Sequence, residues 1–420
     1  MTTTHHDSPP APPFFLLPPI RTALVSPPTR TPSVMIVLGL AVTVITSAVA
    51  MWQAATGFLI DLAVFQDAGK ALLAGDDLYS EHFPTRSGLR FIYPPFAAVL
   101  FTPLVLGGQA VVQVLWTLAT ILAIGAILAM VATRLHLARP HLIAAALTGV
   151  ALLFEPIRSN LDFGQINIFL FLLITADVLG FTPRRFRGVL LGVAAGIKIT
   201  PAAFGVLFLV RGDWAALARS VATVAATILI GLMVRTQESV YFWTHEFFVT
   251  DRGGSADFIR NQAVSGWLAR AGVTDPALSI ATMALFILAA AVAIWGAWRL
   301  TRRHRPVEAF ALVSLAVFVA SPVAVTHHWS GVIIALPLLL ATRPPLLRAS
   351  LVALILAHLI GVHQYADLTA HTGWTAAGHW LLGITQGVTG LLVMVVLLAL
   401  PRPPAIPRHS SPAELVSVAR

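Results

Sequence analysis

The sequence predicts an all-helical protein that crosses a membrane many times. Apolar residues make up 57% of the 420-residue chain, charged residues make up only 11%, and the mean hydropathy is +0.83. Soluble globular proteins carry about 25% charged residues, so this pool cannot build a surface that faces water. Long apolar runs recur along most of the chain, as membrane-spanning helices require.

The same composition excludes several classes of protein. A soluble enzyme and a disordered protein need more polar residues than this chain contains. The net charge of +9 suggests a nucleic-acid-binding protein, but its distribution follows membrane topology instead. The chain contains no cysteine, which excludes disulfides, thiolate metal sites and cysteine nucleophiles.

Three regions are expected along the chain. Residues 1–33 are rich in proline, in the segments SPPAPP, LPPI and SPPTRTP, and proline at this density cannot hold a helix. We therefore expect a disordered tail, and its order of residues is not that of a cleaved signal peptide. An integral-membrane domain over 34–400 and a second tail over 401–420 follow.

The apolar runs define the expected crossing helices. They lie near 34–54, 110–132, 141–154, 166–181, 215–234, 277–300, 307–321, 329–342, 347–362 and 380–400. Several are shorter than the roughly 20 residues that a crossing helix needs, so their ends are expected to extend into flanking polar residues.

Two further apolar stretches are interrupted. Residues 96–106 follow Tyr93-Pro94-Pro95 and are too few to cross, so we expect a re-entrant segment. Residues 188–210 are broken by Lys198-Ile199-Thr200-Pro201, which predicts a hairpin of two short helices. With the hairpin, the sequence predicts about twelve crossings that include short or re-entrant segments.

Loop charge predicts the orientation, because loops rich in arginine remain cytoplasmic. Arginines gather in the loops 134–139, 184–187, 211–219, 302–305 and 343–348. The long loops 55–95 and 235–276 are mixed or acidic and are expected outside, as the roof of an active site. We therefore expect a multi-pass plasma-membrane protein with cytoplasmic termini and chemistry on the extracytoplasmic face.

Asp61 follows the first apolar run directly, at the expected outer boundary of the membrane. Partial burial raises the pKa of a carboxylate, which suits a general base acting on a lipid-borne substrate at that depth. A helix cap or a solvated boundary acid is the structural alternative. Asp67 lies six residues later, whereas Asp76 and Asp77 read as a turn.

Lys198 is the only lysine inside an apolar run. A cation within the membrane is costly and marks a functional site by default. Beside a broken helix it suits a phosphate group, whereas a lysine that reaches toward the headgroups is the alternative.

His327-His328-Trp329 follows Ser321-Pro322 at the expected outer end of a helix. These residues suit phosphate contact, proton transfer or an interfacial aromatic cluster, and adjacent histidines point in different directions. The spacing is not that of a metal site.

Two polar stretches suit a sugar-binding site. The stretch 155–167 contains Arg158, Asn160, Gln165 and Asn167 between apolar helices, and Arg260-Asn261-Gln262 lies in the second long loop. Ordinary loop polarity is the alternative interpretation of each.

Taken in order, these motifs resemble glycosyltransferase family 87, a family of actinobacterial GT-C membrane enzymes that use polyprenyl-phosphate sugars. The resemblance covers roughly residues 57–330. It rests on Asp61 with the segment 73–79, Phe91-Ile92-Tyr93-Pro94-Pro95-Phe96, Gly164-Gln165-Ile166-Asn167, Lys198-Ile199-Thr200-Pro201, Asn261-Gln262 with Gly266 and Arg270, and Ser321-Pro322 through Trp329. Ala263 stands where the family often has serine.

The resemblance implies a polyprenyl-phosphate-mannose donor, a mannosylated phosphatidylinositol lipid or lipoglycan as acceptor, and an α-(1→2) mannoside as product. No cofactor or metal is expected, and the partners are membrane lipids rather than nucleic acid. The expected roles are catalysis by Asp61 and His327, binding of the donor phosphate by Lys198, His328 and Arg158, and sugar or acceptor binding by Tyr93, Asn160, Gln165, Asn167, Asn261, Gln262 and Trp329.

A β-linked mannosyl phosphate that yields an α product requires one in-line displacement, with a base on one face and the leaving group on the other. Arabinofuranosyl transfer from a polyprenyl-phosphate donor is the alternative within the enzyme class. A lipid transporter or flippase is the alternative of another class, and it predicts internal repeats that the sequence does not display.

Overall fold

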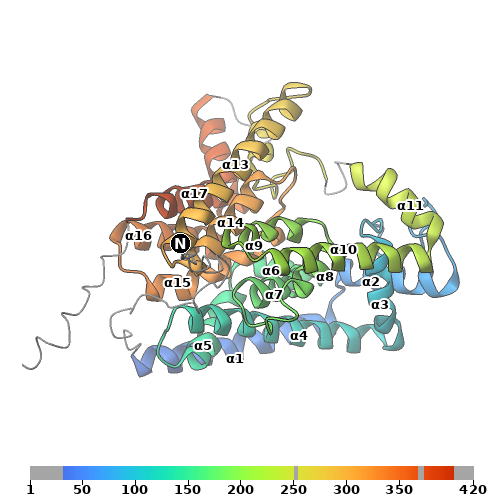
Figure 1. Ribbon diagram of the computed structural model, residues 1–420, viewed down its shortest axis with the longest axis horizontal. Helices are drawn as coiled ribbons and strands as arrows, with labels where there is room; N and C mark the ends of the chain where they lie inside the picture. Colours follow the sequence, from blue (N-terminus) through green and yellow to red (C-terminus); the bar gives the residue numbers. More distant parts are fainter. Residues whose placement is uncertain (1–31, 250–253, 368–372, 402–420) are drawn as a thin grey trace, which may run out of the picture.

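The computed structural model describes residues 32–249, 254–367 and 373–401 (Figure 1). Within these ranges the chain is helical and forms no sheet; an isolated bridge joins Asn261 to Val325. This confirms the predicted all-helical class. The predicted tails 1–33 and 401–420 lie almost wholly outside the described residues.

Five described helices are long and apolar enough to cross a membrane. They are α1 (Ser33–Thr56), α4 (Gln109–Arg134), α10 (Trp214–Val234), α13 (Ala277–Arg302) and α17 (Gly373–Ala399). Four of them begin and end within a few residues of the apolar runs that predict them, whereas α17 begins seven residues before its predicted run, 380–400. These helices confirm a multi-pass membrane protein.

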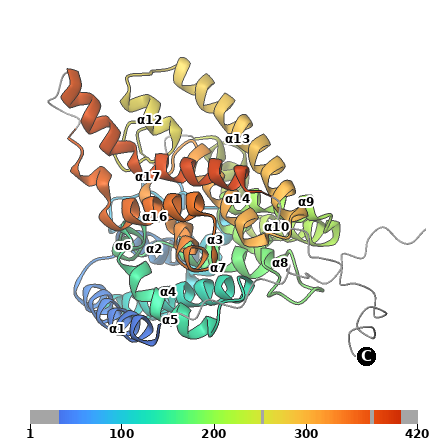
Figure 2. The same ribbon diagram turned by 90° about the vertical axis from the view of Figure 1, so that its left-hand side faces the viewer.

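Helix α1 packs beside α4 and α5 (Pro140–Leu152) on one side of the molecule, and α12 (Val264–Arg270), α13 and α17 lie on the other side (Figure 2). Small residues allow this approach: a Cβ added to Gly149 would lie 2.3 Å from the backbone nitrogen of Thr43. The Thr43 hydroxyl also donates to the Ala145 carbonyl at 2.7 Å, and it accepts from the Gly149 N–H. Close backbone contact and hydroxyl hydrogen bonds are the usual means of joining helices in lipid.

The apolar helices of the rest of the chain are short. They span Pro95–Leu106 (α3 and η1), Asn167–Val178 (α7), Thr200–Arg211 (η2 and α9), Pro306–Ala320 (α14), Thr326–Ala341 (η4 and α15) and Pro345–Ile360 (α16). Most enclose the core, where Phe310, Trp329 and Leu347 are fully buried. The arrangement of about twelve crossings stays a prediction, since length and composition identify only the long helices as able to cross.

One expected polar turn is instead mainly a helix. Residues 155–163 form α6 (Glu155–Phe163), which meets α5 at an angle of 78°. Pro156 stands in the first turn of α6, where its missing N–H has no helical partner in any case. The polar side chains of this stretch therefore occupy fixed positions on a short helix.

Both interrupted stretches are broken at the positions that their proline residues predict. Residues 95–106 form α3 (Pro95–Phe101) followed by η1 (Thr102–Leu106), and they pack on α2 (Ile60–Ala74). Helix α8 (Val189–Ile197) ends at Lys198 in an extended conformation, and η2 (Thr200–Gly205) and α9 (Val206–Arg211) follow.

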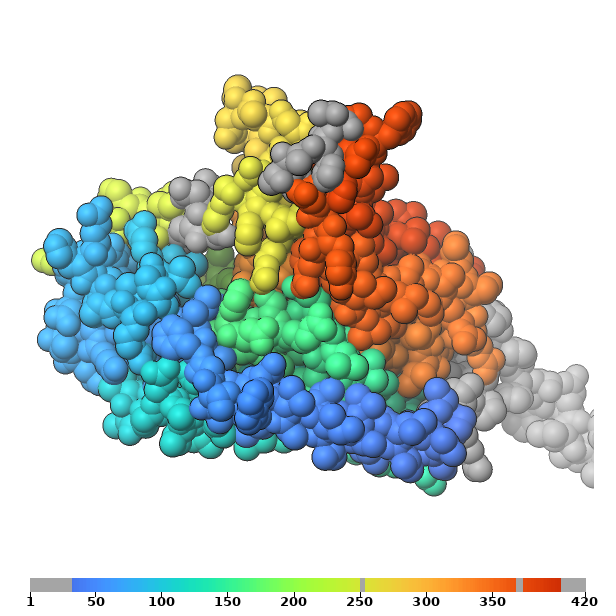
Figure 3. Space-filling view, turned by 180° about the vertical axis from the view of Figure 1, so that it is seen from behind, coloured from blue at the N-terminus to red at the C-terminus, as the bar shows by residue number. Residues whose placement is uncertain are grey.

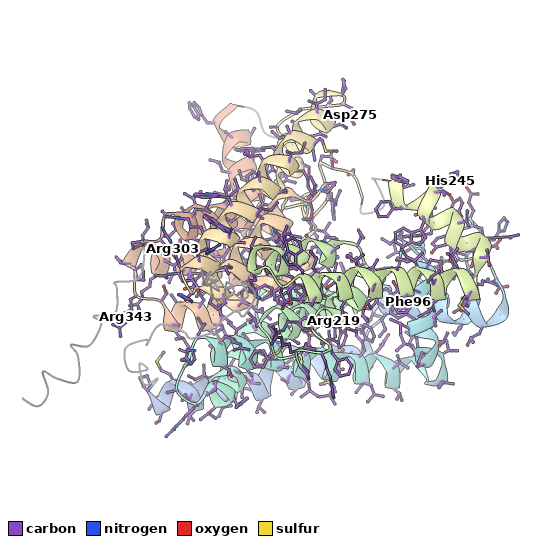
Figure 4. All side chains as sticks on the ribbon, viewed as in Figure 1. Phe96, Arg219, His245, Asp275, Arg303 and Arg343 are labelled. Atoms are coloured by element: carbon purple, nitrogen blue, oxygen red, sulfur yellow. The ribbon has the colours of Figure 1, made fainter. Side chains whose placement is uncertain are left out.

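The long loops carry short helices, namely α2 in the first loop and α11 (Thr236–Thr244), η3 (Glu246–Phe248) and α12 in the second. The short η5 (Val362–Tyr365) joins α16 to α17. Arg303 and Arg343 lie toward one end of the molecule, Phe96 and His245 lie toward the other, and Asp275 lies at the top of the view (Figure 4).

Candidate active site

Asp61 lies in the first turn of α2, immediately after the break that ends α1. Gly57 turns the chain in an extended conformation, and the buried amide of Gln113 on α4 holds this turn. Its Nε2 donates to the carbonyls of Ala54 at 2.7 Å and Gly57 at 3.0 Å, and its Oε1 accepts from the Leu59 N–H at 3.2 Å. One side chain thus fixes the backbone two residues before Asp61.

The Asp61 carboxylate bonds one side chain from a distant segment and is linked through it to a second. Its Oδ2 accepts from Gln165 Nε2 at 2.7 Å, and Gln165 Oε1 accepts from the Tyr93 hydroxyl at 3.3 Å. Burial raises the pKa of Asp61 to about 6, although the Gln165 hydrogen bond and the charge of Lys198 oppose the rise. Burial and the nearby Asp61 charge also raise the pKa of Tyr93, so its hydroxyl remains a donor.

Close packing of the α6–α7 turn on α2 brings Gln165 to Asp61. Gly164 has a φ of +69°, and a Cβ there would lie 2.7 Å from the Leu62 Cβ. Only glycine can adopt this positive φ and also leave room for the Leu62 side chain, which explains why a glycine precedes Gln165. Tyr93 is held in turn by Tyr79, whose hydroxyl donates to the Tyr93 carbonyl at 2.6 Å.

Lys198 stands where α8 ends, and Pro201 prevents the helix from continuing. Its Nζ donates to Asn167 Oδ1 and lies 3.2 Å from His328 Nε2, with the Tyr93 ring 5.8 Å away. Because an ammonium group can only donate, His328 Nε2 must accept, so the His328 ring is neutral with its proton on Nδ1. The charge of Lys198 also acts on the Asp61 carboxylate, so the cation and the carboxylate share one polar site.

The two histidines lie in the first turn of η4 (Thr326–Ile334) and point in different directions, with their rings at 89°. His328 faces Lys198, whereas His327 is buried and packs edge-on against Phe163 at 5.5 Å. Asn167 Nδ2 donates to the His327 carbonyl at 3.2 Å and so joins η4 to α7. Of the two histidines, His328 is therefore the one whose ring contacts Lys198.

Several predicted residues lie outside this cluster. Asn261 and Gln262 are fully buried, and their amides bond backbone groups: Asn261 Oδ1 accepts from the Ala324 N–H at 3.0 Å, and Gln262 Nε2 donates to the Gly383 carbonyl at 2.8 Å. Trp329 is fully buried against Phe318. These contacts favour a supporting role for the three over direct contact with a sugar.

Asn160 is also buried, and its Nδ2 lies 3.4 Å from the Oγ of Ser330, which belongs to η4. Arg158 is exposed on α6 near Asp162, and no described contact joins it to the cluster. Asp67 is buried and pairs with Arg86 at 2.7 Å, so it fixes the first loop.

Sequence reasoning assigned no role to three supporting side chains: Gln113 was missed, whereas Arg260 and the stretch that begins at Glu155 were noted only as polar segments. Gln113 lies within a long apolar helix, where one amide gives little signal. Arg260 stacks on Phe163 at 5.7 Å and lies within electrostatic range of His327. Glu155 is buried, and its carboxylate accepts at 3.0 Å from the hydroxyl of Thr326, the residue before His327.

The described site segments meet around a recess. In the space-filling view the surfaces of α2, α6 and the segment near Arg260 border it (Figure 3). Among the described residues, no group of three His, Asp or Glu side chains is arranged to hold a metal ion. The residues present offer a carboxylate of raised pKa, a cation and several amide and hydroxyl donors.

Comparison with known proteins gives the same family from independent data. The profile of glycosyltransferase family 87 matches residues 91–322. A polyprenol-phosphate-mannose-dependent alpha-(1-2)-phosphatidylinositol mannoside mannosyltransferase from Mycolicibacterium smegmatis is 36% identical over 68% of this chain and 70% of its own. The protein of the same name from Mycobacterium tuberculosis is 34% identical over 81% of this chain and 84% of its own.

A pentamannoside mannosyltransferase of M. smegmatis, also polyprenol-phosphate-mannose-dependent, is 30% identical over 81% of this chain and 83% of its own. Among solved structures, ArnT from Cupriavidus metallidurans bound to undecaprenyl phosphate is similar with a TM-score of 0.44 and 17% identity, over 88% of this chain and 77% of that chain. The family profile covers the segments that carry Gln165 and Lys198, whereas Asp61 lies before its first matched residue and His328 lies after its last. The chain belongs to glycosyltransferase family 87.

Proposed function

We propose that this protein transfers mannose from polyprenyl-phosphate mannose to a mannosylated phosphatidylinositol lipid and forms an α-(1→2) linkage with inversion. The names of its relatives support this donor and acceptor class. The observation that carries the proposal is a carboxylate of raised pKa, Asp61, in one site with the cation of Lys198.

Asp61 acts as the general base. The acceptor hydroxyl oxygen attacks the anomeric carbon while Asp61 takes the hydroxyl proton, and no covalent enzyme intermediate forms. A base with a pKa near 6 is ionised at neutral pH and still accepts a proton readily. Gln165 aims the carboxylate through its 2.7 Å hydrogen bond.

Lys198 and His328 stabilise the departing phosphate. The bond between the anomeric carbon and the phosphate oxygen breaks during attack, and negative charge grows on polyprenyl phosphate. The Lys198 ammonium supplies an opposite charge, and Asn167 holds it in position at 3.2 Å. His327 supports η4 from its buried position, and the buried Tyr93 holds Gln165 beside Asp61 through its hydroxyl.

The active site is proposed to face the extracytoplasmic side of the plasma membrane. This orientation rests on the arginine-rich loops, which remain cytoplasmic by the positive-inside rule. The site residues come from the ends of helices that lie away from those loops. The segments 55–95 and 235–276 then cover the site as its roof, and Arg158 and Arg260 are available near its edge.

The test is mannosyl transfer by the purified protein in detergent. The protein is incubated with polyprenyl-phosphate mannose and a phosphatidylinositol mannoside, and the product linkage is determined. We expect a new α-(1→2)-linked mannose. Transfer of arabinose in place of mannose would overturn the donor assignment, and absence of transfer from either donor would overturn the enzyme assignment, since transport has no meaning in detergent.

A further inference from the structure

A second group of charged side chains surrounds the turn between α7 and α8, far from Asp61. Helix α4 contacts the Asp61 turn through Gln113 and ends at Arg134, which lies roughly 30 Å further along its axis at 1.5 Å per residue. The group therefore belongs to the opposite end of the membrane-spanning bundle. It takes no part in the mechanism proposed above.

Four arginines form this group, which we call the arginine cluster: Arg134, Arg187, Arg211 and Arg219. Three of them donate to carbonyls of the turn after α7. Arg134 Nη2 bonds the Gly180 carbonyl at 3.0 Å, Arg211 bonds the Val178 carbonyl, and Arg219 Nε bonds the Arg187 carbonyl at 2.7 Å. These bonds turn the guanidinium groups toward one another instead of outward into water.

The guanidinium groups approach closely around Gly180. A Cβ added to Gly180 would lie 3.2 Å from Arg134 Nη2 and 3.5 Å from Arg187 Nη2. Arg211 lies within electrostatic range of both. Like charges at such separations repel, and the repulsion is stronger where water is partly excluded.

Nearby carboxylates compensate little of this charge. Asp213 lies 3.4 Å from Arg187, and it also caps α10 by accepting from the Ala216 N–H. Asp177 accepts from the backbone N–H groups of Gly188 and Leu191. Among the ion pairs of the described residues, the arginine cluster takes part in the one with Asp213, which leaves a surplus of positive charge.

Three donors of the arginine cluster are unused. Arg134 Nε, Arg187 Nε and Arg211 Nη2 are shielded from solvent and have no hydrogen-bond partner in the described structure. A buried donor without a partner is unfavourable, and more so when it is charged. The positive-inside rule explains why arginines occur in these loops, but it does not explain shielded donors that converge.

The surroundings place the cluster at the membrane surface. Arg134 ends one crossing helix, and Trp214 begins another and is 55% exposed. Phe181 is 40% exposed and lies under the Arg134 guanidinium at 4.7 Å. Exposed aromatic side chains at helix ends are typical of the headgroup level of a bilayer.

We propose that the arginine cluster binds the phosphate of an anionic phospholipid in the leaflet opposite the active site. A phosphate group brings negative charge and several acceptor oxygens, and guanidinium groups match its geometry. A phospholipid carries this group at the depth of the cluster, and its chains lie along exposed Phe181 and Trp214. Such a lipid joins α4, the α7–α8 turn and α9 without touching substrate.

The test measures lipid binding by the full-length protein. Delipidated protein is placed in phosphatidylcholine nanodiscs that contain increasing fractions of phosphatidylglycerol. Retained lipids are counted by native mass spectrometry, and the unfolding midpoint is recorded. We expect retention of phosphatidylglycerol and a rising midpoint for the wild type. Arg134→Gln with Arg187→Gln should weaken apparent binding by about tenfold or more.

Arg343→Gln is the matched control, because Arg343 is an exposed arginine in another arginine-rich loop and should leave the binding curve unchanged. Equal effects of phosphatidylglycerol and phosphatidylcholine on the wild type would overturn the proposal without any variant. Equal stabilisation by inorganic phosphate alone would show a free-anion site and overturn the lipid assignment. Mannosyl transfer is assayed separately, so failure of the two proposals can be distinguished.

Discussion

Replacement of Gln165 by leucine tests how the protein sets the pKa of Asp61, the proposed base. Gln165 Nε2 donates to Asp61 Oδ2 at 2.7 Å and stabilises the ionised carboxylate, whereas burial raises the pKa of Asp61 to about 6. A hydrogen bond to a charged group contributes about 1.5–3 kcal/mol, and one pKa unit corresponds to about 1.4 kcal/mol. Since Asp61 is only partly buried, we expect a rise of about one unit.

The assay is kcat/KM for mannosyl transfer between pH 5 and 9. A base works only when ionised, so activity rises with pH through the pKa of the free enzyme. We expect the midpoint of this acid limb near pH 6 in the wild type and near pH 7 in Gln165→Leu. The variant should lose about tenfold in activity at pH 5.5 and much less at pH 8.

A buried glutamine elsewhere provides the control. Gln386 on α17 contacts Glu155 and not Asp61, so Gln386→Leu should leave the midpoint near pH 6 even if its overall activity falls. An unchanged midpoint in Gln165→Leu, with equal loss at every pH, would refute the reasoning. It would show that Gln165 supports the fold without tuning Asp61.

Three further outcomes follow from the structure. Lys198→Ala should lower kcat by about 10² and raise the donor KM, because it removes the cation that lies 3.2 Å from His328, and unchanged donor kinetics would remove its role. Gln113→Leu should lower kcat by roughly tenfold or more with wild-type pH dependence, since it frees the turn before Asp61, and a normal kcat would contradict this. Gly361→Ala should destabilise the protein by about 1–3 kcal/mol in thermal or denaturant unfolding, because φ is +66° and a Cβ would lie 2.9 Å from Glu155 Cγ; an unchanged unfolding transition would argue against it.

The long helices were predictable because their signal is local. Apolar runs of about 20 residues gave α1, α4 and α10 within a few residues of their observed ends. The break at Lys198 was predictable for the same reason, since Pro201 acts on its own helix. The helix α6 was not predicted, because its polar side chains resemble a loop and its stability comes from packing between other helices.

Asp61 and Lys198 were predictable from charge and depth, but their partners were only partly so. Gln165 was expected to contact sugar, whereas its amide donates to the Asp61 carboxylate across 104 residues of sequence. Asn261 and Gln262 were expected at the sugar, and their burial against backbone carbonyls and N–H groups depends on a tertiary arrangement that no local pattern reveals. Gln113 was missed because one amide in an apolar helix has no sequence signature.

The most direct test of the central claim is mannosyl transfer by Asp61→Asn at saturating donor and acceptor. Asparagine keeps the size of the side chain and can still hydrogen-bond Gln165, but it cannot take a proton. The account predicts donor binding close to that of the wild type and a loss of at least about 10² in kcat at neutral pH. Turnover near the wild-type rate would contradict the assignment of Asp61 as the base.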